Sequence, residues 1–175
     1  MSRLQLLIAV LPLVFMLHDF EEIIFLGPWQ RRGLPKLRGR FPRLSWLLAR
    51  FERMSTTAFA LAVAEQFVIY SAVTVLAIWW NWYFCWLALF AAFSLHLVAH
   101  VAQWLVVRRY IPAIVTTLLA LPYCAFMTVK LVSIGAFTQR EWVEWGAIGV
   151  GFSLVNLLLA HLITGRVFVS TRDSR

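Results

Sequence analysis

The sequence predicts an all-α, polytopic membrane protein: a bundle of five transmembrane helices, with an interfacial helix in the first cytoplasmic loop. Of its 175 residues, 62% are hydrophobic and only 14% are charged, whereas a soluble domain averages about 25% charged residues. The apolar residues form long stretches, and most cations fall between them. Neither a repeat nor a linker divides the chain, so we expect a single transmembrane domain over residues 1–175.

A helix needs about 20 apolar residues to cross the hydrocarbon core. Five stretches meet this requirement: 4–26, 56–80, 83–107, 111–134 and 143–168. The segment 28–55 carries eight Lys and Arg residues and a single acid, Glu52. By the positive-inside rule it is a basic cytoplasmic loop, with the N-terminus outside and the C-terminus inside. We therefore expect a multi-pass protein of a bacterial-type cytoplasmic (inner) membrane.

Within the basic loop, residues 43–54 show an amphipathic helical pattern. The apolar face contains Leu44, Leu47, Leu48, Phe51 and Met54, and the opposite face contains Arg43, Arg50 and Arg53. This pattern is typical of a helix that lies on the membrane surface, with its cations toward anionic head groups of the inner leaflet. A role as a loop anchor is favoured over a role as a substrate gate.

Other function classes are disfavoured by the sequence. The net charge of +8 does not indicate a nucleic-acid partner, because the cations lie in loops between apolar spans. Cys85 and Cys124 provide neither a disulfide framework nor a thiolate metal site. The first apolar stretch contains Pro12 and continues into ionisable residues, so we expect a retained helix in place of a cleaved signal peptide.

The segment His18-Asp19-Phe20-Glu21-Glu22 places four ionisable groups directly after the apolar residues 4–17. Charged side chains at membrane depth are costly, and they occur where they pair, face a cavity or bind an ion. Helical spacing puts His18, Glu21 and Glu22 on one face. Asp19 points about 100° away from His18 and is expected to be a cap, an ion-pair partner or a supporting group.

All four histidines of the chain fall within predicted spans: His18, His96, His100 and His161. His96 and His100 are an i, i+4 pair, a spacing that lets two imidazoles bind one metal. Glu65 interrupts the second span, and Asn156 interrupts the fifth, about 140° from His161 on the helix. The predicted topology places these polar residues in a layer about 10 Å thick in the cytoplasmic half of the bilayer.

These residue types favour a divalent transition metal, with Zn²⁺ preferred and Fe²⁺ or Mn²⁺ as alternatives. The candidate ligands, for one or two ions, are His18, Glu22, His96, His100 and His161. A glutamate that does not bind metal would act as general base, and the candidates are Glu21, Glu22 and Glu65. Asn156 and His161 would orient groups or stabilise an oxyanion.

His18, Glu21 and Glu22 in a first membrane span resemble the motif of the HXXEE family of bacterial membrane proteins. The resemblance implies a metal-dependent activity that uses these three residues, together with His96 or His100, Asn156 and His161. The chain is also loosely similar to glutamate-containing intramembrane proteases that process prenylated proteins. It departs from them in the arginine spacing after the glutamates and in the spacing of Phe93 to His96.

We therefore expect an intramembrane metal-dependent enzyme, a hydrolase or related transferase that acts on a lipid, prenyl or membrane-peptide substrate. A small proton- or metal-ion-coupled transporter or channel could use the same polar network without catalysis. A dimetal-carboxylate oxidase or a haem protein are further alternatives, and a metal-free structural network also fits the pattern. The sequence leaves the reaction and the oligomeric state open.

Overall fold

A computed structural model describes the backbone of residues 2–52 and 54–170, and the side chains of these residues except 47, 50, 51 and 160–170. Every regular element in these ranges is helical and none is a strand, so the all-α prediction is confirmed. In chain order the elements are α1 (Arg3–Ala9), α2 (Leu11–Arg32), α3 (Leu34–Arg40), a 3₁₀ turn (Pro42–Leu44), α4 (Ser45–Glu52), α5 (Thr56–Trp80), α6 (Tyr83–Val107), α7 (Ile114–Ser133) and α8 (Gln139–Ser170).

Among the described residues, four helices are long and apolar enough to cross a membrane: α5, α6, α7 and the part of α8 over residues 139–159. By length and composition this is a membrane protein. The remaining predicted span, 4–26, corresponds to α1 and α2. It does not qualify on the same basis, because α2 carries three carboxylates in its middle and two arginines at its end.

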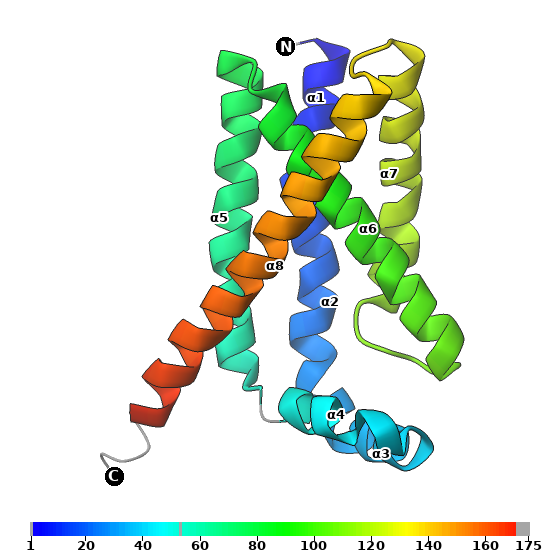
Figure 1. Ribbon diagram of the computed structural model, residues 1–175, viewed down its shortest axis with the longest axis vertical. Coiled ribbons are helices and arrows are strands. Elements are labelled where there is room, and N and C mark those ends of the chain that lie inside the picture. The colour runs from blue at the N-terminus through cyan, green and yellow to red at the C-terminus, as the bar shows by residue number, and fades with distance from the viewer. Residues whose placement is uncertain (1, 53, 171–175) are drawn as a thin grey trace.

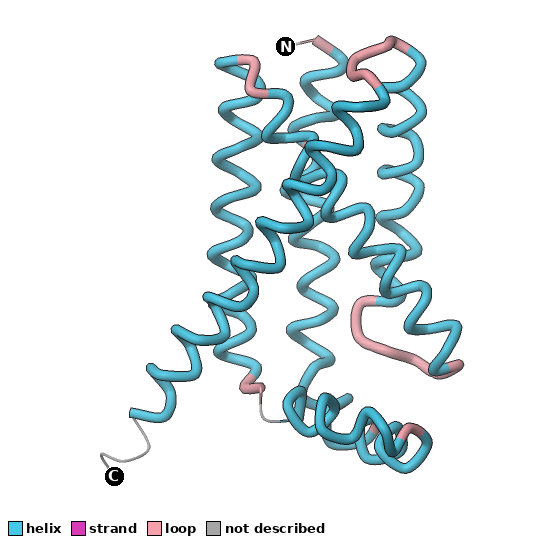
Figure 2. Tube along the Cα trace, viewed as in Figure 1, coloured by secondary structure: helices cyan, strands magenta, loops and turns pink. Residues whose placement is uncertain are grey.

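The charged helix α2 lies between α5 and α7 in the view of Figure 1. It packs against α5 and α7, while α6 packs against α7 and crosses α8. Helices α3 and α4 lie across one end of the bundle, and the loops gather at its two ends (Figure 2). Apolar residues such as Leu13, Leu17 and Ile24 form an exposed face of α2, whereas His18, Asp19 and Glu21 are buried against the neighbouring helices, where charged groups are tolerated.

The first predicted span is not continuous, because the helix breaks at Val10, two residues before Pro12. Proline has no N–H to donate and its ring clashes with the carbonyl four residues earlier. The carbonyls next to the break find donors on other helices. The indole N–H of Trp86 donates to the Ile8 oxygen at 3.3 Å, and the Tyr123 hydroxyl donates to the Leu7 oxygen at 2.9 Å. The break therefore fixes α1 and α2 against α6 and α7.

The predicted basic loop, residues 28–55, is largely helical. Helix α2 continues through Pro28 to Arg32, and α3 and α4 follow. The amphipathic pattern expected over residues 43–54 forms α4 over a shorter range. Four residues of that pattern lie outside the described side chains: Leu47, Arg50, Phe51 and Arg53.

Two polar contacts hold this helical segment at the end of the bundle. Arg38 pairs with Glu52 at 2.8 Å, which joins α3 to α4. The Arg40 guanidinium donates to the Val107 oxygen at 2.8 Å and so caps the last turn of α6.

An aromatic core closes the middle of the bundle. The rings of Phe15 and Tyr70 stack with centroids 4.4 Å apart, and Phe93 packs edge-on against Phe15 at 5.9 Å. The Tyr70 hydroxyl donates to the Leu89 oxygen at 3.2 Å, which joins α5 to α6. The ring of Phe93 also lies 5.7 Å from that of His18, so the aromatic core sets the position of the first candidate ligand.

Helices α6 and α8 approach closely at Gly149. A Cβ atom at this position would lie 1.9 Å from the Ala88 carbonyl oxygen, whereas a Cβ at Gly151 would meet nothing within 4 Å. Small residues let membrane helices pack backbone to backbone in this way. The position of α8 therefore depends on Gly149.

We predict that Gly149→Ala destabilises the protein and Gly151→Ala does not. The obstacle for the new methyl group is backbone, which cannot rotate away, so the cost is about 1–3 kcal/mol. Thermal unfolding of both variants in the same detergent tests this prediction. Equal midpoints for the two variants would contradict the close crossing of α6 and α8.

Candidate metal centre

Helices α2 and α6 bring together four of the side chains predicted as metal ligands. Each offers one donor atom, and all four donors lie within 4.8 Å of one another: His18, Glu22, His96 and His100. The periodicity of the two helices explains the convergence. Residues four apart share a face, and both pairs, His18 with Glu22 and His96 with His100, have this spacing.

The distances within this cluster suit a small divalent cation. The Nε2 atoms of His96 and His100 are 3.0 Å apart, and His100 Nε2 lies 3.4 Å from Glu22 Oε1. Zn–N bonds of about 2.0–2.1 Å in a tetrahedral site place neighbouring donors about 3.3 Å apart. The distances from His100 to His96 and to Glu22 are therefore already close to the spacing that a bound metal would need.

His18 is the most deeply buried member of the cluster, with 1% of its surface exposed. Its ring centroid lies 5.3 Å from that of His96 and 5.1 Å from that of His100. Its Nδ1 atom lies 3.5 Å from the Thr117 hydroxyl on α7, and its Nε2 atom has no hydrogen-bond partner among the described residues. A buried nitrogen without a partner is costly, so this atom fits a metal donor.

Exposure differs across the cluster. His18 and His100 are buried and Glu22 is partly buried, whereas His96 is exposed. The cluster is closed on the side of α7 and the aromatic core, and it is open beside His96. A molecule could therefore approach it from the outer surface of the bundle without passing along the axis.

Glu21 is engaged with the start of α7. Its Oε2 atom accepts from the backbone N–H and the hydroxyl of Thr116, both at 2.7 Å. Its Oε1 atom accepts from the Tyr110 hydroxyl at 2.8 Å and from the Val115 N–H at 3.4 Å. The N-terminus of a helix has unpaired N–H groups and a positive partial charge. Glu21 thus satisfies donors of α7, while the next residue, Glu22, faces the histidines.

Tyr110 is a contributor that sequence reasoning missed. It lies in the loop between α6 and α7, 89 residues after its partner Glu21. Partial burial and the hydrogen bond to Glu21 raise the pKa of Tyr110, so its hydroxyl remains a donor. Its single signal in the sequence is its place after Arg108 and Arg109 at the end of a span, where an aromatic residue is ordinary.

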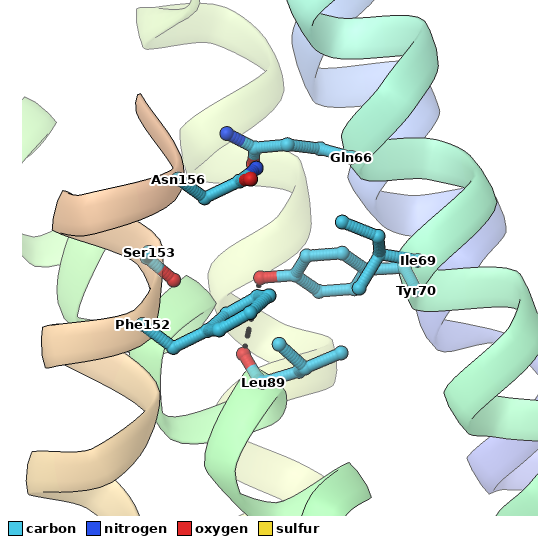
Figure 3. A pocket seen from close by; sticks show the side chains of 7 residues that line it. All are labelled: Gln66, Ile69, Tyr70, Leu89, Phe152, Ser153 and Asn156. Carbon is cyan, nitrogen blue, oxygen red and sulfur yellow. Dashed lines mark hydrogen bonds between the residues drawn. The ribbon is translucent and has the colours of Figure 1, made fainter. Parts of the chain in front are cut away.

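Two further predicted site residues, Glu65 and Asn156, are hydrogen-bonded to each other. Asn156 donates to Glu65 at 3.0 Å, which joins α8 to α5. Gln66 and Asn156 point toward each other across the space between these helices, and Ser153 and the Tyr70 hydroxyl lie nearby (Figure 3). Neither Glu65 nor Asn156 belongs to the described group of metal-compatible donors. The side chain of His161 lies outside the described residues.

Asp19 is also separate from the cluster, as its angular position predicts. It is 6% exposed, and its Oδ2 atom has no hydrogen-bond partner among the described residues. The structure does not place it as a cap or an ion-pair partner.

Comparison with known proteins yields one match. The model of the family described as "Protein of unknown function with HXXEE motif" matches residues 9–127. This range includes α2, α5 and α6, and hence all four members of the cluster. No curated protein and no solved structure matches the chain.

We predict that Glu21→Ala destabilises the fold and leaves metal binding intact. The substitution removes acceptors from the first turn of α7, and leaving such a donor unpaired costs about 1–3 kcal/mol. Glu52→Ala is the matched control, because it removes an exposed ion pair worth about 0–1 kcal/mol. Denaturant unfolding and metal analysis of both variants provide the measurement. Loss of metal with unchanged stability in Glu21→Ala would instead place Glu21 among the ligands.

Proposed function

The chain belongs to the family of proteins of unknown function with an HXXEE motif, and we propose that it is an intramembrane metal-dependent enzyme. The observation that supports this proposal most strongly is that four possible metal-donor atoms from α2 and α6 lie within 4.8 Å of one another. We assign the metal to His18, Glu22, His96 and His100. Three imidazoles and a carboxylate favour Zn²⁺, with Fe²⁺ or Mn²⁺ as alternatives.

The proposed reaction is hydrolysis or a related transfer on a lipid, prenyl or membrane-peptide substrate. A divalent metal in such a site supplies Lewis acidity and lowers the pKa of a bound water. The chain's own groups support this chemistry. Thr117 orients His18 from α7, and such supporting contacts tune metal sites.

Glu22 is the proposed general base as well as a ligand. Glu21 already accepts four hydrogen bonds, and Glu65 is bonded to Asn156. Glu22 Oε1 lies 3.4 Å from His100 Nε2, and we assign proton transfer to its second oxygen, Oε2. This assignment narrows the choice among the three glutamates to the one beside the histidines.

The proposed environment of the site is the inner half of a bacterial-type cytoplasmic membrane. We propose that α1 and α2 form a fifth span alongside the four apolar helices, with the N-terminus outside and the C-terminus inside. The supporting observation is that the cation-rich segment from Arg31 to Arg43 lies at one end of the bundle, which the positive-inside rule assigns to the cytoplasm. Exposure of His96 supports substrate entry from the bilayer.

We predict that detergent-purified protein contains about one equivalent of transition metal, and that His18→Ala and His100→Ala lose most of it. Each variant removes one of four donors, and metal affinity depends on ligand number. Glu65→Gln is the control, because it changes a carboxylate outside the cluster, and it should retain the metal. Mass spectrometric metal analysis of folded protein is the measurement. A metal-free wild type, or retention in both histidine variants, would refute the assignment.

A further inference from the structure

A groove of about 950 Å³ opens at the basic end of the bundle, between α2, α3 and the loop that follows α6. Its volume is typical of small-molecule sites, which span about 300–1,000 Å³. None of its described lining residues is acidic, and four of them are cationic: Arg32, Lys36, Arg40 and Arg109. The groove is therefore suited to an anion.

None of these four cations has an anionic partner among the described residues. Arg40 donates to the Val107 oxygen, whereas Arg32, Lys36 and Arg109 form no ion pair with any described residue. Arg38, which lies on α3 with Lys36 and Arg40, pairs with Glu52 and does not line the groove. Like charges gathered in one concave surface attract anions from solution or from the membrane. Arginine in particular recognises phosphate through paired hydrogen bonds.

The other residues that line the groove are uncharged, and three of them are aromatic: Phe25, Trp29 and Tyr110. The rings of Phe25 and Tyr110 lie 5.8 Å apart, and the Trp29 side chain packs over Gly33, where a Cβ would come within 2.7 Å of its indole nitrogen. The groove lies where the apolar helix α6 ends at Val107 and gives way to basic residues. A site that is apolar on one side and cationic on the other at this boundary fits a lipid better than a free ion.

Helical periodicity relates this groove to the metal cluster. Trp29 follows Glu22 by seven residues on α2, and Val107 follows His100 by seven on α6. Seven residues are two turns, so the groove lies on the same faces of both helices, about 10 Å from the cluster. Tyr110 also connects the two regions, because it lines the groove and donates to Glu21.

We propose that the groove binds the phosphate head group of an anionic membrane phospholipid, and that this lipid class is the substrate of the metal centre. The second half of this proposal rests on the proposed function. With the phosphate held by Arg32, Lys36 and Arg109, the apolar part of the lipid extends along α2 and α6 toward the exposed side of the cluster. The bond nearest the metal would then lie on the acyl side of the phosphate.

The test is native mass spectrometry of the full chain in detergent, titrated with phosphatidylglycerol or with phosphatidylcholine. The triple variant Arg32→Gln/Lys36→Gln/Arg109→Gln should lose at least about ten-fold in phosphatidylglycerol affinity, because each cation near a charged lipid contributes independently. The control triple Arg31→Gln/Arg43→Gln/Arg108→Gln removes the same number of positive charges from the basic end of the bundle, and none of its three residues lines the groove. It should change affinity by about two-fold or less.

Three results would overturn the groove assignment: an equal loss in both triples, equal affinity for phosphatidylcholine, or displacement of the lipid by millimolar inorganic phosphate. Metal analysis of the same samples separates this proposal from the proposed function. Both triples should keep the metal, and His100→Ala should lose metal but retain lipid. Groove-dependent lipid binding in a metal-free wild type would support the head-group site and overturn the substrate assignment.

Discussion

The charge on α2 is the constraint on which the remaining structure depends. Three carboxylates and an imidazole within five residues cannot be exposed to hydrocarbon, where each would cost several kcal/mol. The side chains of these residues face different neighbouring helices. Glu21 meets the N–H groups of α7, while His18 and Glu22 meet the two histidines of α6. The buried face of α2 packs against α5 and α7, and α8 crosses closely over α6 at Gly149.

Sequence reasoning located the part of the site that follows from helical period and depth. The i, i+4 spacing of His96 with His100, together with the level of His18 in its span, was enough to bring these residues into one layer. Depth fixes position along the bundle axis but not the order of helices around it. For this reason the sequence assigned Glu65 and Asn156 to the same layer without their partners, and the structure shows that they are hydrogen-bonded to each other between α5 and α8.

The sequence did not predict contacts between residues that are far apart in the chain. Glu21 is bonded to Tyr110 and to the first turn of α7, about 90 residues later, and no local pattern reports such a partner. The break before Pro12 was also missed, because a long apolar stretch dominated the interpretation of the first span. It is tolerated since Trp86 and Tyr123 donate to the carbonyls beside it. The segment 28–55, predicted as a loop with one amphipathic helix, also contains the end of α2 and the helix α3.

The central claim is that three imidazoles and one carboxylate, and no thiol, surround a single metal. X-ray absorption spectroscopy of the zinc-loaded wild type measures this directly. The account predicts a shell of nitrogen and oxygen at about 2.0–2.1 Å, with the outer-shell scattering of three imidazoles. A sulfur contribution near 2.3 Å, which only Cys85, Cys124 or a methionine could supply, would contradict it. A shell of oxygen without imidazole scattering would contradict it equally.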